Sequence, residues 1–184
     1  MKKAYVITEG ESDVAVLKKL LPAHLTKEVE IVSGQGDYGA RSLAASILAA
    51  RQRPVALVID ADTNDEQMIK ERADFARWSL RQAAADVPFE VFVAVPSIES
   101  VFFQDQALIE NFAHREFTDL EWRLVKLQPQ ELFANEPGGK RQVIQRLLHN
   151  LNKESVKLLQ EHPLIQALTD FLSSVVENGN RSNG

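Results

Sequence analysis

Apolar residues in the first half of the chain occur in short runs, separated by segments in which they recur at helical spacing. The runs predict four strands, at residues 4–8, 29–32, 54–59 and 89–95. The intervening segments predict helices at residues 13–24, 39–51 and 65–85. The third run is apolar throughout, which is typical of a strand buried on both faces. Strands that alternate with helices over short connections indicate an α/β fold with a four-stranded parallel sheet flanked by helices.

Beyond residue 100 the pattern changes to helical spacing only. It predicts helices at residues 105–114, 118–126, 139–151 and 153–176, the last interrupted near Pro163. We therefore expect an α/β domain over residues 1–104 and a C-terminal helical extension, packed on it, over residues 105–176. The polar segment 177–184 is expected to be a disordered tail.

Composition narrows the classes of protein that the chain can represent. With 184 residues, 45% of them hydrophobic and 26% charged, it reads as an ordinary globular protein. The absence of cysteine excludes disulfides and thiolate metal sites and favours a cytoplasmic location. The first apolar segment reaches Glu9 before a signal-peptide core could form, and no segment approaches a membrane span. A net charge of -5 gives no general attraction for nucleic acid, so any such binding requires a local site.

Acidic residues follow three of the four predicted strands. Glu9 follows the first strand, Asp60 and Asp62 the third, and Glu99 the fourth. Ligands of open parallel sheets bind at the carboxyl ends of the strands, so these side chains are expected to converge. Clustered carboxylates repel one another unless a cation is present, and Mg2+ or Mn2+ prefers oxygen ligands. The pattern therefore predicts a divalent metal site.

A purely structural interpretation stays open for some of these acids. Ser12 can cap a helix that begins at Asp13, and Glu11 and Asp13 can complement the helix dipole. An Asp-x-Asp pair is also common in the polar turn after a buried strand. The recurrence of acids at successive strand ends is what favours the metal site.

Other conspicuous residues are assigned structural roles. We expect the large apolar side chains Trp78, Trp122, Phe102 and Phe103 to lie in the core. The glycines that follow the second strand, Gly34, Gly36 and Gly39, either shape a loop or let the backbone approach a substrate closely.

The order and spacing of these motifs resemble a known family. Glu9-Gly10 at the end of an apolar strand, then Asp13, and later a strand that runs into Asp60-x-Asp62, resemble the Toprim domain over residues 4 to about 100. This is the catalytic fold of topoisomerases, bacterial primases, RecR-type recombination proteins and OLD-family nucleases. The resemblance implies acid-base or metal chemistry for Glu9 and Mg2+ binding by Asp60 and Asp62. Asp13 would join the metal shell, as the matching acid does in OLD-like nucleases.

Missing features separate the branches of the family. The chain lacks the zinc-binding cysteines of primases and RecR-type proteins, and its two tyrosines do not match the nucleophile domain of topoisomerases. It therefore most resembles the Toprim half of OLD-family nucleases and the small Toprim ribonucleases. "VPSIESVFF" supplies Ser97 and Glu99, and "EPGGKRQVIQRLL" supplies Lys140, at places where OLD-like nucleases carry a Ser/acid segment and a lysine. OLD proteins attach an ATPase to this half. No phosphate-binding loop occurs here, so an ATPase partner would be a separate chain.

The resulting hypothesis is Mg2+-dependent hydrolysis of a nucleic-acid phosphodiester, either DNA or RNA. Two ions would be held, one by Glu9 and Asp13 with Asp60, the other by Asp62 and Glu99. Lys140 would neutralise charge on the phosphoryl oxygens, unless it is only a solvated residue after the Gly138-Gly139 turn. Two alternatives remain: a non-catalytic partner-binding or regulatory module that keeps the fold, and a metal-dependent nucleotide-sugar transferase.

Overall fold

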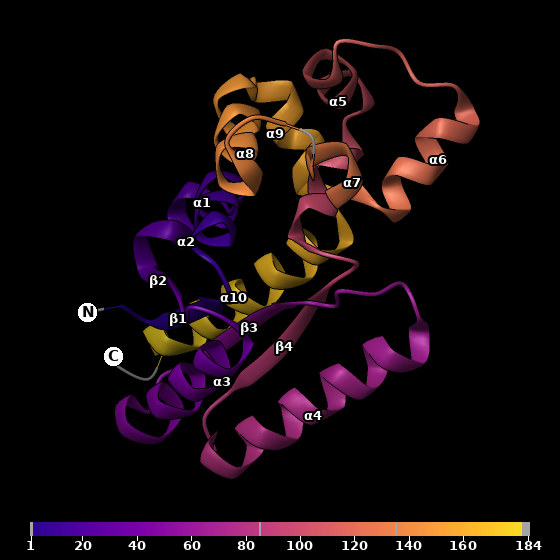
Figure 1. Ribbon diagram of the computed structural model, residues 1–184. Coiled ribbons are helices and arrows are strands. Elements are labelled where there is room, and N and C mark those ends of the chain that lie inside the picture. The colour runs from indigo at the N-terminus through magenta and orange to yellow at the C-terminus, as the bar shows by residue number, and fades with distance from the viewer. Residues whose placement is uncertain (1, 85, 135, 182–184) are drawn as a thin grey trace.

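The computed structural model describes residues 2–84, 86–134 and 136–181, and its centre is a four-stranded sheet. All neighbouring strands are parallel, in the order β2-β1-β3-β4. The strands are β1 (Ala4–Thr8), β2 (Val29–Ser33), β3 (Val55–Asp60) and β4 (Phe89–Ala94). Helices cover both faces of the sheet (Figure 1), so the predicted α/β fold is confirmed.

The connections between strands are helical, as predicted, although some helices begin or divide at other residues than expected. They are α1 (Glu11–Leu20), α2 (Ala23–Glu28), α3 (Asp37–Ser46), the π-helical turn η1 (Ile47–Arg51) and α4 (Glu66–Ala84). The predicted helix 13–24 is two helices, because Pro22 has no N–H to continue the hydrogen-bond ladder and stands as the N-cap of α2. α1 also begins two residues earlier than predicted, at Glu11.

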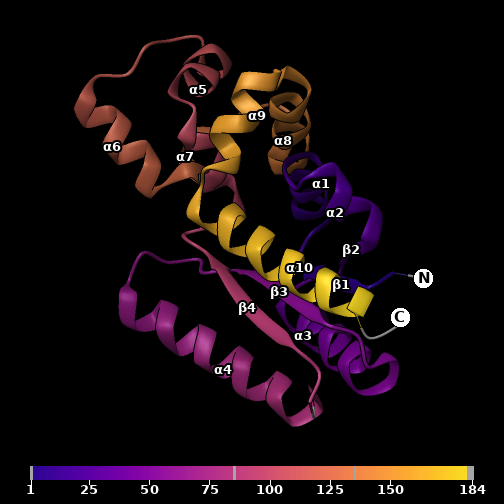
Figure 2. The ribbon, with the colours of Figure 1, turned by 180° about the vertical axis from the view of Figure 1, so that it is seen from behind.

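Successive residues of β3 serve opposite faces of the sheet. Val55, Leu57 and Ile59 pack in a cluster with α3, η1 and α4. Ala56 and Val58 pack in a second cluster with α1, α2 and α10 (Pro163–Arg181). Figure 2 shows α10 crossing this second face of the sheet. The period-two alternation of a strand thus explains why an uninterrupted apolar run is needed here.

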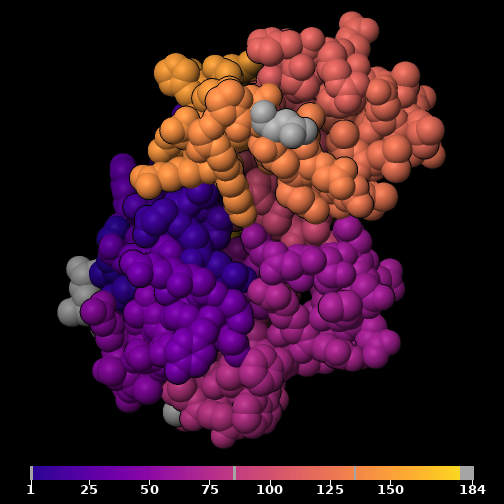
Figure 3. Space-filling model, in the orientation of Figure 1, coloured from indigo at the N-terminus to yellow at the C-terminus, as the bar shows by residue number. Residues whose placement is uncertain are grey.

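The second half of the chain is helical, and its part before α10 gathers at one end of the molecule, coloured salmon to orange in Figure 3. Before α10 it consists of η2 (Ile98–Gln104), α5 (Gln106–Ala113), α6 (Asp119–Leu127), α7 (Pro129–Ala134), α8 (Gly139–Asn150) and α9 (Lys153–Gln160). The six-residue α7 was not predicted, because it is too short to show a period. α10 continues through Arg181, so the segment predicted as a tail begins within this helix, and residues 182–184 lie outside the described part.

One core joins the sheet to the helical extension. Val6 and Val58 from the sheet belong to the same buried cluster as Ile144 of α8 and Leu168 and Leu172 of α10. The extension therefore covers apolar surface that the sheet would otherwise expose. None of the helices in the described part of the chain combines the length and apolarity needed to cross a membrane.

The aromatic residues assigned to the core follow the prediction with one exception. Phe102 and Phe103 are buried, and Trp122 packs against the same cluster. Trp78 is 61% exposed, so that prediction was wrong. The inward face of α4 is already filled by smaller residues, among them Ala76 and Leu80, which leaves Trp78 on the outside.

Leu172→Ala tests whether the extension and the sheet unfold together. Leu172 is completely buried between them, so we expect a loss of about 2–5 kcal/mol in the free energy of unfolding. Urea denaturation followed by far-UV circular dichroism and by tryptophan fluorescence measures it, with both signals changing in one transition. Leu158→Ala, at an exposed position on α9, is the control and should change stability by less than about 0.5 kcal/mol. Two separate transitions in the wild-type protein would contradict a shared core.

Candidate functional site

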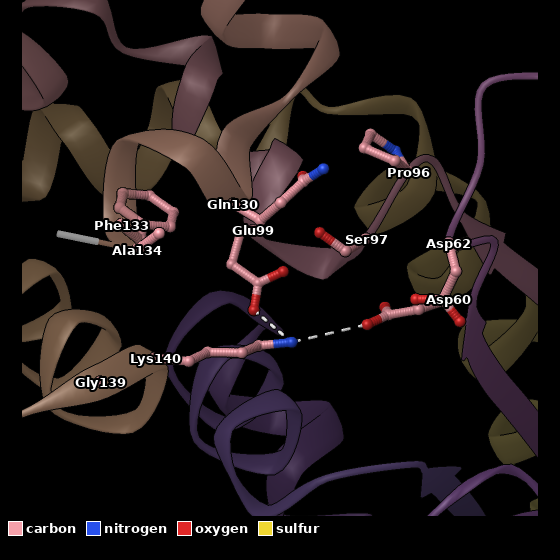
Figure 4. Close-up of a pocket in the computed structure, with 10 residues that line it drawn as sticks. All are labelled: Asp60, Asp62, Pro96, Ser97, Glu99, Gln130, Phe133, Ala134, Gly139 and Lys140. Carbon is pink, nitrogen blue, oxygen red and sulfur yellow. Dashed lines mark ion pairs between the residues drawn. The ribbon is translucent and has the colours of Figure 1, made fainter.

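A pocket of about 290 Å3 lies at the carboxyl ends of β3 and β4, under α7 and α8 (Figure 4). It is lined by Asp60, Asp62, Pro96, Ser97, Glu99, Gln130, Phe133, Ala134, Gly139 and Lys140. Four of the six predicted site residues, Asp60, Asp62, Glu99 and Lys140, therefore line a single pocket directly, and both halves of the chain contribute to it.

Glu9 stands at the end of β1 and is fixed from two sides. Its side-chain Oε1 accepts a hydrogen bond from the Asp60 N–H at 2.9 Å, which joins the ends of β1 and β3. Its carbonyl accepts from the Gly36 N–H at 2.7 Å and from the Ser33 Oγ at 3.2 Å. A Cβ at Gly34 would overlap the Ala40 backbone, so the glycines after β2 have a structural role in packing the loop that holds Glu9.

Asp13 lies in the first turn of α1 and has two environments. Its Oδ2 accepts a hydrogen bond from the Gly10 N–H at 2.9 Å. Asp13 and not Ser12 therefore caps α1, since the helix begins before Ser12 and Gly10 is the N-cap. The side chain is only 5% exposed, and it interacts electrostatically with Asp60, Glu99 and Lys140 in the pocket. Asp13 therefore both caps α1 and lies beside the carboxylates of the pocket.

Lys140 reaches between two carboxylates in the pocket, as Figure 4 shows. Its Nζ lies 2.6 Å from Oε1 of Glu99 and 3.6 Å from Oδ2 of Asp60. Asp60 is held by the Ile98 N–H, which donates to Oδ1 at 2.9 Å and ties the end of β3 to the start of η2. Glu99 is 3% exposed. Lys140 is therefore not a merely solvated residue, although it follows a turn.

The turn before Lys140 depends on glycine. Gly138 and Gly139 have φ angles of 90° and 70°, in the left-handed region that residues with a Cβ rarely adopt. A Cβ at Gly138 would also overlap the side chain of Gln142. This turn starts α8 and places Lys140 over the end of the sheet.

Arg72 of α4 is a member of the site that the sequence did not reveal. Its guanidinium lies 3.3 Å from Oε1 of Glu9 and 3.3 Å from Oδ2 of Asp62. The only signal in the sequence was an arginine in a helix that also carries Lys70, Glu71 and Asp74. That signal is weak, because charged residues on a helix usually face solvent.

The acids thus form two neighbouring groups, each with its own cation. The inner group is Asp13, Asp60, Glu99 and Lys140, and the outer group is Glu9, Asp62 and Arg72. This grouping differs from the predicted one, which placed Glu99 with Asp62 and Asp13 with Glu9. The difference arises because Asp62 adopts a left-handed backbone conformation (φ 56°) and pairs with Arg72 on the exposed side.

Burial and repulsion shift the acid-base equilibria of the site. Burial, with the negative charges of Asp13 and Glu99, raises the pKa of Asp60 to about 7. Burial also raises the pKa of Asp13 and that of Glu9. Burial alone would lower the pKa of Lys140, but the carboxylates of Glu99, Asp60 and Asp13 raise it, so the ammonium form is retained.

The residues of the inner group fit a divalent cation. Three carboxylates face one ammonium, so the group carries excess negative charge when all are ionised, and carboxylate oxygens are the donors that Mg2+ and Mn2+ prefer. Among residues 2–84, 86–134 and 136–181, no three or more His, Cys, Asp or Glu side chains are arranged as a ready metal-binding set. The side chain of Lys140 lies between Asp60 and Glu99, where such a set would have to close.

Two solved structures are similar to this chain along nearly all of its length. The C-terminal region of the Xanthomonas campestris pv. campestris OLD protein is 12% identical with a TM-score of 0.42, over 99% of this chain and 96% of that chain. The C-terminal region of the Burkholderia pseudomallei OLD protein is 12% identical with a TM-score of 0.46, over 100% of both chains. No family model matches the sequence, and no curated protein matches it significantly. Identity and TM-scores this low give no support to a functional assignment, which therefore depends on the residues of the site.

Asp60→Asn tests the electrostatic strain of the inner group. The pKa of Asp60 is raised from its ordinary value of 3.8 to about 7, so its ionisation destabilises the folded state progressively between these pH values and constantly above them. In EDTA at pH 8 we expect the variant to melt about 2–8 °C higher than the wild type, and the gain to vanish near pH 4. Differential scanning calorimetry across pH 4–8 measures it.

Glu161→Gln, a neutralised exposed acid outside the pocket, is the matched control and should show no such pH-dependent gain. A melting temperature for Asp60→Asn that is equal to or below that of the wild type at pH 8 would contradict the raised pKa.

Proposed function

We propose that this protein hydrolyses phosphodiester bonds of nucleic acid with the help of Mg2+ or Mn2+. The observation that carries the proposal is the inner group, in which Asp13, Asp60 and Glu99 gather around Lys140 at the carboxyl edge of a parallel sheet. A site with buried carboxylates, a cation and an adjoining pocket suits a substrate whose reacting group is anionic and is delivered with a metal.

The inner group would hold the metal through the carboxylates of Asp60 and Glu99, with the free oxygen of Asp13 beside them. A bound divalent cation would supply Lewis-acid polarisation of the phosphodiester and neutralise its charge. Lys140 would leave its ion pair with Glu99 and place its ammonium against the phosphoryl oxygens, where negative charge increases in the transition state. Its raised pKa keeps it protonated for this role.

Glu9 is suited to accept a proton from the attacking water. Its Oε1 is occupied by the Asp60 N–H and by Arg72, whereas Oε2 accepts no hydrogen bond from any described residue. Burial raises the pKa of Glu9 and so makes it a stronger base than an exposed glutamate. Arg72 would orient the carboxylate and keep Asp62 nearby.

The nature of the substrate is supported by the motifs. Glu9-Gly10, Asp13 and Asp60-x-Asp62 resemble those of Toprim nucleases, and the fold brings these motifs to one edge of the sheet. The net charge of -5 limits non-specific attraction for nucleic acid, so the bound cation and Lys140 would provide the local positive charge.

Removal of single site carboxylates should abolish metal-dependent cleavage. We expect Glu9→Gln and Asp60→Asn to lower the cleavage rate by at least roughly 100-fold, because each removes a base or a metal ligand. We expect Lys140→Met to lower it by about 100- to 1,000-fold, because it removes a positive charge from the transition state. Rates are measured on single-stranded, duplex and structured RNA and DNA with increasing Mg2+ and Mn2+.

The same Glu161→Gln variant provides a charge-matched control and should cleave at the wild-type rate. Metal binding by the wild type without cleavage of any of these substrates would refute the proposal and would favour a non-catalytic binding module. Cleavage that survives Asp60→Asn unchanged would show that the activity belongs to another site or to a contaminant.

A further inference from the structure

The outer face of α4 carries two large aromatic side chains that the core does not use. Phe75 is 54% exposed and Trp78 is 61% exposed, while the core side of the helix is filled by other residues. Their rings stack with centroids 6.3 Å apart and an interplanar angle of 21°. Single exposed apolar residues are ordinary on protein surfaces. Two stacked rings form a contiguous apolar patch, and such patches are typical of interaction sites.

Arginines flank this pair on both sides. Arg72, Phe75, Trp78 and Arg81 follow one another at intervals of three residues, so each side chain neighbours the next on the helix surface. We call these four residues the α4 row. It spans about 13.5 Å along the helix axis, at 1.5 Å per residue. On the α3 side, the Arg41 guanidinium lies 4.8 Å from the centroid of the Phe75 ring.

The α4 row begins at the candidate site. Arg72 contacts Glu9 and Asp62 of the outer group, and Trp78 and Arg81 lie further along α4, which runs antiparallel to the strands and away from the carboxyl edge of the sheet (Figure 1). A polymer bound across the pocket can therefore continue directly onto α4.

We propose that the α4 row binds the single-stranded part of a nucleic-acid substrate. Bases would stack on Phe75 and Trp78, and the phosphates would pair with Arg81, which makes no ion pair with any described residue. Bases in a duplex are already stacked on their neighbours, so the row selects single strands. This inference rests on the proposed function, because it assigns the substrate class of the same site.

A protein partner suits this surface less well. Charged side chains surround the two rings, with Lys70, Glu71, Asp74 and Arg81 all exposed on α4. The centres of protein–protein interfaces are depleted of lysine and acidic residues, because burying them unpaired is costly. A pair of aromatic side chains with an arginine on each side suits the bases and phosphates of a single strand better.

Binding of fluorescein-labelled dT20 to the full chain, measured by anisotropy in EDTA, tests the proposal without requiring catalysis. The wild type should bind dT20 at least about tenfold more tightly than the corresponding 20-base-pair duplex. Trp78→Ala should weaken binding about 5- to 150-fold, and Trp78→Phe should stay within about threefold of the wild type. Leu124→Ala, which removes an exposed apolar side chain from α6, is the control and should stay within about twofold.

Two further measurements separate base stacking from a change in folding. Trp122→Phe leaves Trp78 as the only tryptophan, and its fluorescence should be quenched when dT20 binds. Arg81→Gln should reduce the slope of log affinity against log salt by about 0.7, as expected when one phosphate contact is lost.

The possible results divide clearly. Wild-type protein that does not bind dT20, or Trp78 fluorescence that dT20 leaves unchanged, would overturn the proposal. The proposal would also be overturned if Trp78→Ala bound dT20 as tightly as the wild type and, by light scattering, was a monomer where the wild type is a dimer. The aromatic pair would then join two copies of the chain. Asp60→Asn should bind dT20 at least as tightly as the wild type, since it removes a negative charge. Strand binding without metal-dependent cleavage would therefore keep the α4 row and remove only the proposed nuclease activity.

Discussion

The attraction between one lysine and the buried carboxylates at the end of the sheet is the interaction on which the site depends. Glu99 and Asp13 are almost fully buried, and burial, together with the negative charges of Asp13 and Glu99, raises the pKa of Asp60 to about 7. Buried carboxylates this close together are stable only when a positive charge lies between them. Lys140 provides that charge at 2.6 Å from Glu99 and explains why the acids can be held together inside the protein.

This requirement links the two halves of the chain. The carboxylates come from α1, the end of β3 and the segment after β4, whereas Lys140 comes from α8, beyond a turn of two glycines in left-handed conformation. The halves also share an apolar core, through residues such as Leu168 and Leu172 of α10. The helical extension is therefore more than a cover for the sheet, because it carries the cation of the site. A metal that replaced the Lys140 ammonium would free this side chain to face a substrate, so charge balance and catalysis would depend on the same exchange.

Much of the fold and part of the site could be predicted from the sequence. The strands are encoded locally, as the period-two sharing of β3 between two cores illustrates, and parallel topology then brings Glu9, Asp60 and Glu99 to one edge. Two kinds of feature escaped prediction. The first is Arg72. The sequence around it is typical of a solvent-facing helix, and Arg72 reaches Glu9 only because α4 packs across the sheet.

The second kind concerns which face of a helix is covered. Trp78 was predicted to be buried because of its size, but small residues such as Ala76 satisfy the inward face of α4. The start of α1 was predicted two residues too late because glycine is a weak N-cap signal. In the structure Gly10 is the N-cap, and its N–H donates a hydrogen bond to the Asp13 carboxylate. Both cases depend on long-range packing or on backbone conformation, which residue type alone does not determine.

The proposed function requires that the Asp13, Asp60 and Glu99 carboxylates form a divalent-cation site from which Lys140 can be displaced. The most direct test is an anomalous difference map from crystals grown with Mn2+ at pH 8, where Asp60 is mostly ionised. We expect an anomalous peak within ligand distance of Asp60 and Glu99, with the Lys140 ammonium moved out of its ion pair. If, at saturating Mn2+, the Lys140 ammonium still paired with Glu99 and no anomalous peak appeared at this edge of the sheet, the proposed metal site would be contradicted.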